Sequence, residues 1–303
     1  MPGFLKLFVY ILFSAALALC IDFAFSPKTS IISPVAEAYQ PKKLTLNLFR
    51  KDKNPEDLKK ALKRIIGTEW NNYSIYVVDY NSKFTMGINE SIIYSAASVN
   101  KVPILVTIYD AARSGKIDFD KVITVQQDDI QDYGTGSIRY DPPGTTYSVK
   151  TLIQLMLQQS DNTAAYILAN YVVGLESIQN YINGLGLTQT NINNNKTSNK
   201  DMAILFDKIY HKSITTQALQ DEMLGFLSNS DFEDRLPGQL PEGVNVYHKI
   251  GTATGAVHDV GIVTHENVAY YIGVFTSDVP DEEQAAALIA KISKVVYDYM
   301  RKN

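Results

Sequence analysis

Three short motifs follow one another along the chain, and their side chains can together transfer an acyl group. They are Ser98-Val99-Asn100-Lys101, Ser160-Asp161-Asn162 and Lys249-Ile250-Gly251. A serine hydroxyl is a weak nucleophile at neutral pH and needs a base. Because residues three apart share one face of a helix, the Lys101 amine can reach the Ser98 hydroxyl. A lone Ser-x-x-Lys arises by chance in chains of this length, so the ordered set of three is what indicates acyl transfer.

Each motif also has a purely structural interpretation. Ser98 alone could cap a helix, with Lys101 as a solvated lysine, and Ser160-Asp161-Asn162 could cap the helix that follows it. Lys249 on a strand would ordinarily be a surface charge. The joint occurrence of the three motifs favours catalysis over these interpretations.

The elements that must position the motifs divide into strand-rich ends and a helical middle. Patterns of β-forming residues fall at 73–79, around Phe84, and at 245–249, 260–264 and 268–276. Apolar residues at helical spacing cover 56–66, 98–112, 148–157, 162–173, 202–210 and 281–300, which places Ser98 at a helix N-terminus. We therefore predict an α/β (α+β) fold in which an antiparallel sheet is flanked by the N- and C-terminal helices and carries an inserted all-helical subdomain. The motifs would meet at the seam between the two parts, where pockets commonly form.

From about Pro55 to its end, the chain resembles class A β-lactamases and the penicillin-binding proteins that share their fold. Besides the three motifs, the resemblance rests on Gly134-Thr135-Gly136-Ser137-Ile138, Pro143-Gly144, Arg235-Leu236-Pro237, Leu240-Pro241-Glu242-Gly243 and His258-Asp259-Val260-Gly261-Ile262. It implies a class A β-lactamase-like fold and a serine hydrolase that needs neither a metal nor a cofactor.

The resemblance also implies a role for each motif residue. Ser98 is the nucleophile, Lys101 its base, Ser160 the proton relay to the leaving nitrogen, and Lys249 the second cation that lowers the pKa of Lys101. The N–H groups of Ser98 and Thr252 form the oxyanion hole. Asn162, Gly251 and Thr252 bind substrate, and Arg235 has the spacing of a carboxylate-binding arginine. A structural ion pair of Arg235 with Asp231, Glu233 or Asp234 is the alternative.

The chain departs from the family pattern at two places. Class A β-lactamases carry a loop glutamate that activates water for deacylation, whereas here no acidic residue lies between Glu176 and Asp201. Glu176 with Asn180 imitates the spacing but falls too early, on an expected helix. The second departure is Ile250, where the family usually has Thr or Ser to help bind the substrate carboxylate; Thr252 lies two residues on, on the same strand face.

Composition excludes several other classes of protein. The 303 residues carry a net charge of −4, which gives no electrostatic reason to expect nucleic acid. The single cysteine, Cys20, rules out an intrachain disulfide, and no Cys/His pattern has metal-ligand spacing. The four histidines are scattered; His248 and His258 flank the third motif, and we expect core or strand-surface positions for these two. We expect a monomer.

The N-terminal segment indicates export. Leu7 to Ile21 is apolar and follows Lys6, so residues 1–25 are interpreted as a signal peptide, or as a membrane anchor through residues 7–25. The proline-rich and polar residues 26–54 form a linker, and 55–303 form the catalytic domain, with an α/β part at about 55–95 and 240–303 and a helical part at about 96–239. The expected location is extracytoplasmic, either secreted or anchored to the cytoplasmic membrane.

The leading functional hypothesis is a serine acyl-enzyme hydrolase, acylated at Ser98 by β-lactams or by D-Ala-D-Ala peptides of the cell wall, with slow deacylation because the loop glutamate is missing. One alternative is a functional β-lactamase that hydrolyses the β-lactam amide. A non-catalytic cell-wall-binding module and an esterase or amidase of another substrate class remain further alternatives.

Overall fold

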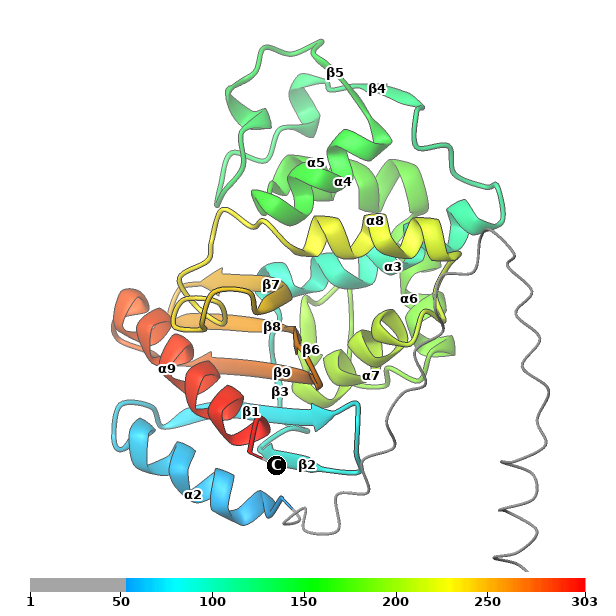
Figure 1. Ribbon diagram of the computed structural model, residues 1–303. Coiled ribbons are helices and arrows are strands. Elements are labelled where there is room, and N and C mark those ends of the chain that lie inside the picture. Colours follow the sequence, from blue (N-terminus) through cyan, green and yellow to red (C-terminus); the bar gives the residue numbers. More distant parts are fainter. Residues whose placement is uncertain (1–52, 303) are drawn as a thin grey trace, which may run out of the picture. The chain divides into compact units, whose positions relative to one another are not determined.

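A five-stranded antiparallel sheet forms the centre of the protein in the computed structural model, which describes residues 53–302. The strand order is β2-β1-β9-β8-β7, so the first strands of the domain lie beside the last (Figure 1). The strands are β1 (Asn72–Asp79), β2 (Thr85–Ile88), β7 (Asn245–Ala253), β8 (Ala256–His265) and β9 (Val268–Ser277). This order leaves β7, which carries the third motif, at a free edge of the sheet.

The central strands are apolar on both faces because each face is covered. Along β9, Tyr270, Ile272 and Val274 pack into one core, whereas Tyr271 and Phe275 point into the other. This alternation is the period of two expected of a strand. A sheet buried on both sides gives nearly continuous hydrophobic runs instead of alternating ones, as the sequences of β8 and β9 do.

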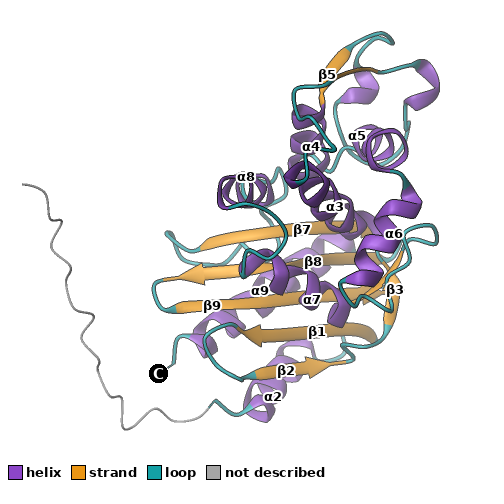
Figure 2. Ribbon diagram, turned by 90° about the vertical axis from the view of Figure 1, so that its right-hand side faces the viewer, coloured by secondary structure: helices purple, strands orange, loops and turns teal. Residues whose placement is uncertain are grey.

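Helices α2 (Pro55–Ile66) and α9 (Glu282–Met300) cover one face of the sheet (Figures 1 and 2). Both begin at capped N-termini, because the side chain of Asn54 accepts from the N–H of Glu56 and that of Asp281 accepts from the N–H of Gln284. The opposite face is covered by α7 (Asn199–Tyr210), whose N-cap is Ser198.

The remaining helices stand beyond β7 and surround α3 (Lys101–Arg113). Every residue of α3 from Lys101 to Tyr109 is buried, as expected for a helix at the centre of its subdomain. Around it lie α4 (Val149–Gln158), α5 (Asn162–Ile167), the π-helical segment η4 (Leu168–Val173), α6 (Leu175–Gly184) and α8 (Gln217–Leu227). Short 3-10 turns occur at η1 (Ala97–Asn100), η2 (Gln127–Asp129) and η3 (Ile138–Tyr140).

The predicted fold class is confirmed: an antiparallel sheet flanked by the terminal helices of the domain, with a helical insertion. The insertion is not purely helical, because β4 (Val122–Thr124) pairs with β5 (Thr146–Ser148), and β6 (Lys196–Ser198) pairs with β3 (Ile93–Ser95). The strand expected at 245–249 is four residues longer as β7, and the strand expected at 260–264 is five residues longer as β8, because the two strands pair from Asn245 to Ala253 and from Ala256 to Thr264.

The predicted signal peptide or anchor and most of the predicted linker lie outside the described residues. Within 53–302, no helix combines the length and the apolar character needed to cross a membrane.

Candidate active site

Ser98 is presented by a short, tightly held turn at the start of the central helix. It lies in η1, directly before α3, and the preceding residue Ala97 has a φ of +46°. A non-glycine residue in this left-handed region is uncommon and costs backbone energy, which the surrounding structure must compensate. The turn is held on one side by the hydrogen bond from the Ala96 N–H to the Asn195 carbonyl. On the other side Gly251 of β7 lies so close that an added Cβ would sit 3.0 Å from the Ala96 carbonyl oxygen.

The amine of Lys101 links the first motif to the second. Its Nζ lies 3.1 Å from Ser98 Oγ and 3.1 Å from Ser160 Oγ, and it also contacts Asn162 Oδ1 at 2.8 Å and the Ser160 carbonyl at 2.6 Å. Burial lowers the pKa of Lys101 to about 7, although the charge of Asp161 opposes the shift. A neutral amine at this distance can accept the proton of the Ser98 hydroxyl.

Ser160 occupies the turn between α4 and α5, and Asp161 holds that turn in shape. The Asp161 carboxylate accepts the N–H of Ala164, which caps α5, and the N–H of Ile138. Gly136, at φ +114°, packs so closely that a Cβ there would lie 2.2 Å from Asp161 Oδ2. Ser160 itself has a φ of +54°. The structural interpretation therefore applies to Asp161, while the Ser160 side chain faces the lysines.

Lys249 approaches the same serine from the sheet. Its Nζ lies 3.0 Å from Ser160 Oγ and 3.2 Å from the Ile250 carbonyl, and the side chain is fully buried on β7. Burial lowers the pKa of Lys249 well below its ordinary value, the charges of Lys101 and Arg235 lower it further, and Asp259 opposes them. Two buried amines thus converge on one hydroxyl, an arrangement that can pass a proton through Ser160.

The register of β7 turns the Thr252 amide toward the site. Thr252 pairs with Val257, whose N–H and C=O both contact the Thr276 hydroxyl on the β9 side. Because the peptide groups of Val257 point toward β9, Val257 and Thr252 form a non-hydrogen-bonded pair of the antiparallel ladder. In such a pair the peptide groups of both residues point away from each other. The Thr252 N–H therefore faces the free edge of β7, against which η1 packs. The predicted pair of oxyanion donors, Ser98 and Thr252, belongs to these two adjoining elements.

Arg235 is buried between the sheet edge and the cavity. Its Nη1 donates to the carbonyls of Gly251 (3.1 Å) and His258 (2.7 Å), and its Nη2 donates to Thr252 Oγ1 (2.6 Å). Of the three acidic residues considered as ion-pair partners, Asp234 is within reach, with 3.9 Å between its Oδ1 and the Arg235 Nε. Because Thr252 Oγ1 accepts from Arg235, its own hydrogen is free to donate to a carboxylate. Ile250, beside it, offers no donor.

Most of the predicted site residues line one cavity of about 860 Å³, namely Ser98, Lys101, Ser160, Asn162, Arg235 and Thr252, whereas Lys249 and Gly251 are not part of its wall. Its wall includes residues of all three motifs together with Arg235 and Thr252. It is lined by no aspartate or glutamate from the described part of the chain, and the loop that resembles the family's glutamate-bearing loop contributes Ile192 and Asn195. Glu176 is exposed in the first turn of α6 and is not part of the cavity wall. This agrees with the sequence analysis, which rejected Glu176 as the loop glutamate.

The cavity wall also contains residues that the sequence did not single out. They are Asn100, Tyr133, Phe232, Ile192 and Asn195, among others. Asn100 lies inside the first motif and donates to Asn195 Oδ1 at 2.7 Å, and Tyr133 directly precedes the Gly134–Ile138 segment. For Asn100 and Tyr133, their position inside or next to a recognised motif was the signal that could have identified them. Phe232 had none, because a lone aromatic among polar residues is ordinary in a loop.

Two histidines are buried in the sheet, as expected of core positions, in different protonation states. His258 accepts the N–H of Thr276 at Nδ1, so its Nε2 carries the proton and donates to the Ser95 carbonyl, and burial lowers its pKa to about 4. His248 instead pairs with Asp259. Within residues 53–302, no cluster of His, Cys, Asp and Glu is arranged to hold a metal ion.

Comparison with known proteins agrees with this geometry. Residues 57–300 match the family described as the β-lactamase enzyme family. β-Lactamase VEB-1 of Pseudomonas aeruginosa is 24% identical over 254 residues, which are 74% of this chain and 84% of that protein. Among solved structures, PBP-A superposes with a TM-score of 0.76 at 25% identity, covering 82% of this chain and 97% of that one. A leucine-to-glutamate mutant of PBP-A, solved as an acyl-enzyme complex with penicillin G, gives a TM-score of 0.76 at 24% identity over 82% of this chain and 97% of that one.

Proposed function

Because the chain belongs to the β-lactamase enzyme family, whose members are serine hydrolases, we propose that it forms an acyl-enzyme at Ser98 with β-lactams or with D-Ala-D-Ala peptides and releases the acyl group slowly. The observation that carries the proposal is the cavity of about 860 Å³, which brings a paired serine and lysine together with a wall that lacks a carboxylate among the described residues.

Acylation follows from the contacts of the Ser98 hydroxyl. Neutral Lys101, 3.1 Å away, accepts the proton as Ser98 Oγ bonds to the substrate carbonyl carbon. The N–H groups of Ser98 and Thr252 stabilise the resulting oxyanion, and such a donor is worth roughly 3–4 kcal/mol of barrier. The proton then passes from Lys101 through the Ser160 hydroxyl to the substrate nitrogen, the carbon–nitrogen bond breaks, and an ester to Ser98 remains.

Deacylation requires a base that removes a proton from a water molecule beside the new ester. The wall positions supplied by Ile192 and Asn195 hold an alkyl group and a neutral amide, neither of which can accept that proton. Lys101 and Lys249 are the remaining bases in reach, and both lie on the Ser160 side of Ser98. This supports acylation that is much faster than hydrolysis.

Mass spectrometry of the intact protein after addition of benzylpenicillin tests the proposal. We expect one adduct of the mass of benzylpenicillin on the wild type, none on Ser98→Ala, and persistence of the adduct over minutes to hours. The absence of an adduct on the wild type, or an equal adduct on Ser98→Ala, would refute acylation at Ser98.

A functional β-lactamase is the second candidate, favoured by the names of relatives such as β-lactamase VEB-1. Steady-state hydrolysis of a chromogenic cephalosporin separates it from the first: rapid turnover by the wild type would contradict slow deacylation. A non-catalytic binding module is disfavoured by the complete set of contacts among Ser98, Lys101 and Ser160.

A further inference from the structure

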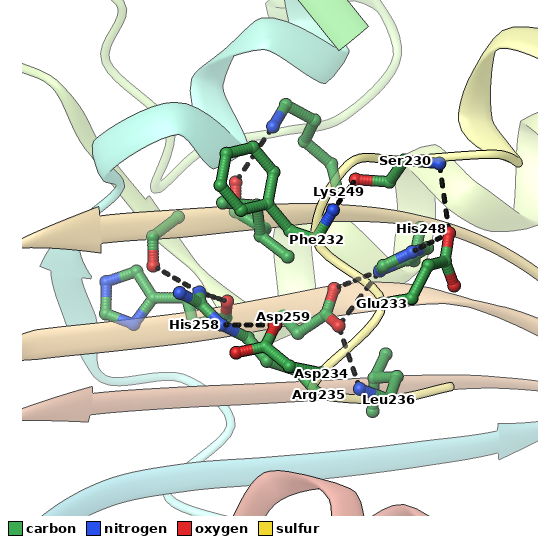
Figure 3. A network of polar contacts seen from close by, with 12 residues as sticks. Ser230, Phe232, Glu233, Asp234, Arg235, Leu236, His248, Lys249, His258 and Asp259 are labelled. Atoms are coloured by element: carbon green, nitrogen blue, oxygen red, sulfur yellow. Dashed lines mark hydrogen bonds and ion pairs between the residues drawn. The ribbon is translucent and has the colours of Figure 1, made fainter. Parts of the chain in front are cut away.

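Outside the three motifs, a fully buried ion pair joins the two strands next to the site. His248 on β7 and Asp259 on β8 have no exposed side-chain surface, and His248 Nδ1 lies 2.9 Å from both carboxylate oxygens of Asp259 (Figure 3). His248 directly precedes Lys249, but its side chain points to the opposite face of the strand, as adjacent residues of a strand do. Neither residue lines the cavity, so neither contacts the substrate directly.

The ion pair extends to the segment 230–236, which contacts both β7 and β8. Asp259 Oδ2 accepts the N–H of Leu236 at 3.0 Å. In the middle of the segment, Glu233 Oε1 lies 3.6 Å from His248 Nε2 and accepts the N–H of Ser230 at 2.9 Å (Figure 3). The pair therefore attaches the segment to the sheet at its middle, through Glu233, and at its C-terminal end, through Leu236.

The other side of this segment forms part of the cavity wall. Phe232 and Arg235 both line the cavity, and Arg235 sets the orientation of the Thr252 hydroxyl through a 2.6 Å hydrogen bond. Burial lowers the pKa of Arg235, and among the nearby acidic groups Asp259 opposes this lowering most strongly. The Arg235 guanidinium and the Thr252 hydroxyl are the two groups best placed to meet a substrate carboxylate. A displacement of the segment would move the guanidinium and, through their hydrogen bond, reorient the hydroxyl.

We propose that His248 and Asp259 are positioning residues that hold the segment 230–236 against the sheet, and that they thereby set the affinity for carboxylate-bearing substrates without setting the rate of acyl transfer. The inference rests on the proposed acylation of Ser98. The reacting groups Ser98, Lys101 and Ser160 are held by η1, α3 and the Asp161 turn, none of which is hydrogen-bonded to the pair.

The charges that face His248 indicate when the attachment is intact. Burial would lower the pKa of His248, but Asp259 and Glu233 together raise it to about 9. The charge of Asp259 also acts on the neighbouring cations Lys249 and Arg235, whose pKa values it raises against the effect of burial. His248 thus remains protonated through neutral pH, and the ion pair is lost above about pH 9.

The test separates binding from chemistry in the full-length protein. Acylation by benzylpenicillin is followed by rapid-quench mass spectrometry over a range of concentrations, which gives a dissociation constant and an acylation rate constant. For His248→Asn we expect the dissociation constant to rise about tenfold, the effect of losing a hydrogen bond to a charged group, with the rate constant within about twofold of wild type. The methyl ester of benzylpenicillin, which lacks the carboxylate, should show no such difference between the two proteins.

Two further variants and a control keep the result interpretable. Glu233→Gln, at a half-exposed position that tolerates substitution, should raise the dissociation constant about two- to threefold. The double variant His248→Asn/Asp259→Asn buries no unpaired charge, so its dissociation constant should be closer to that of wild type than the constant of Asp259→Asn alone. His211→Asn removes an exposed His–Asp pair at the C-terminal end of α7 and should leave both constants unchanged.

The dissociation constant of wild type should also rise above about pH 9, and that rise should disappear in His248→Asn. An unchanged dissociation constant in His248→Asn and Glu233→Gln, or an equal fall in the acylation rate constant, would overturn the positioning role while leaving acylation intact. Absence of any adduct on wild type would instead refute the proposed function together with this inference.

Discussion

The pH dependence of acylation tests the most specific chemical prediction of the structure, that neutral Lys101 is the base. Burial at 5% exposure lowers the pKa of Lys101 from 10.5 to about 7. This difference corresponds to about 5 kcal/mol of preference for the neutral amine relative to an exposed lysine. At pH 7 about half of the molecules therefore hold Lys101 ready to accept a proton.

The sign of the effect follows from which form reacts. Protonation removes the lone pair, so the acylation rate constant should rise with pH through about 7 and level off above about 8. Each unit below the pKa lowers the neutral fraction about tenfold, so acylation at pH 5 should be about 100-fold slower than the plateau. An ordinary lysine would place the same rise above pH 10.

The assay is rapid-quench mass spectrometry of the benzylpenicillin adduct between pH 5 and 9. Lys101→Arg keeps a cation that stays protonated, so it should acylate about 10²- to 10⁴-fold more slowly, without the rise near pH 7. Lys150→Met, which removes a partly exposed lysine paired with Glu222, serves as the matched control and should retain the wild-type profile. A profile that is flat from pH 5 to 8, or a midpoint near 10, would refute Lys101 as the base.

Three further predictions follow from single side chains. Ile192→Glu places a carboxylate in the cavity wall and should shorten the lifetime of the penicilloyl adduct about tenfold or more, as measured by a mass-spectrometric time course. Asn193→Glu, at an exposed position, is its control. Equal adduct lifetimes in the two variants would contradict the account of deacylation. Asp161→Ala removes the cap of α5 and leaves the buried N–H of Ile138 unpaired, so urea denaturation should show about 2–4 kcal/mol less stability, and a loss under about 0.5 kcal/mol would disagree with the turn's dependence on Asp161. The pKa of His248 is raised from 6.5 to about 9, so its stabilising contribution is complete below pH 6.5 and declines as the pH rises to about 9. Relative to His248→Asn, the wild type should lose about 3 kcal/mol of unfolding free energy over that interval. A stability difference that stays constant with pH would count against a buried, charged His248.

Much of the fold could be predicted from local patterns. The helix at residues 56–66 and the closing helix at 281–300 show apolar residues at helical spacing behind capping residues, and both occur as α2 and α9. The strand ends are harder to place, because Ile250, Gly251, Thr252 and Ala253 extend β7 through pairing with β8, which is not a local property. The helix expected at 162–173 is α-helical only to Ile167 and has π-helical geometry from Leu168 to Val173.

The sequence by itself determined the chemistry that is available: a serine with a lysine on the same helix face, a second serine and a second lysine, in an order typical of one family. It also determined that the loop before Asp201 brings no carboxylate. These are properties of residue type and short spacing, which a linear chain displays directly.

Only the tertiary structure decided how these groups act. Lys101 and Ser160 are 59 positions apart, and Lys249 and Ser160 are 89 apart, yet each amine lies within 3.1 Å of the Ser160 hydroxyl. Their pKa values are lowered because folding buries them, and an unfolded chain leaves every lysine in water. The role of Arg235 likewise depended on which carbonyls and hydroxyl the folded sheet edge presents to it, since a charge in a loop has no partner until long-range packing supplies one.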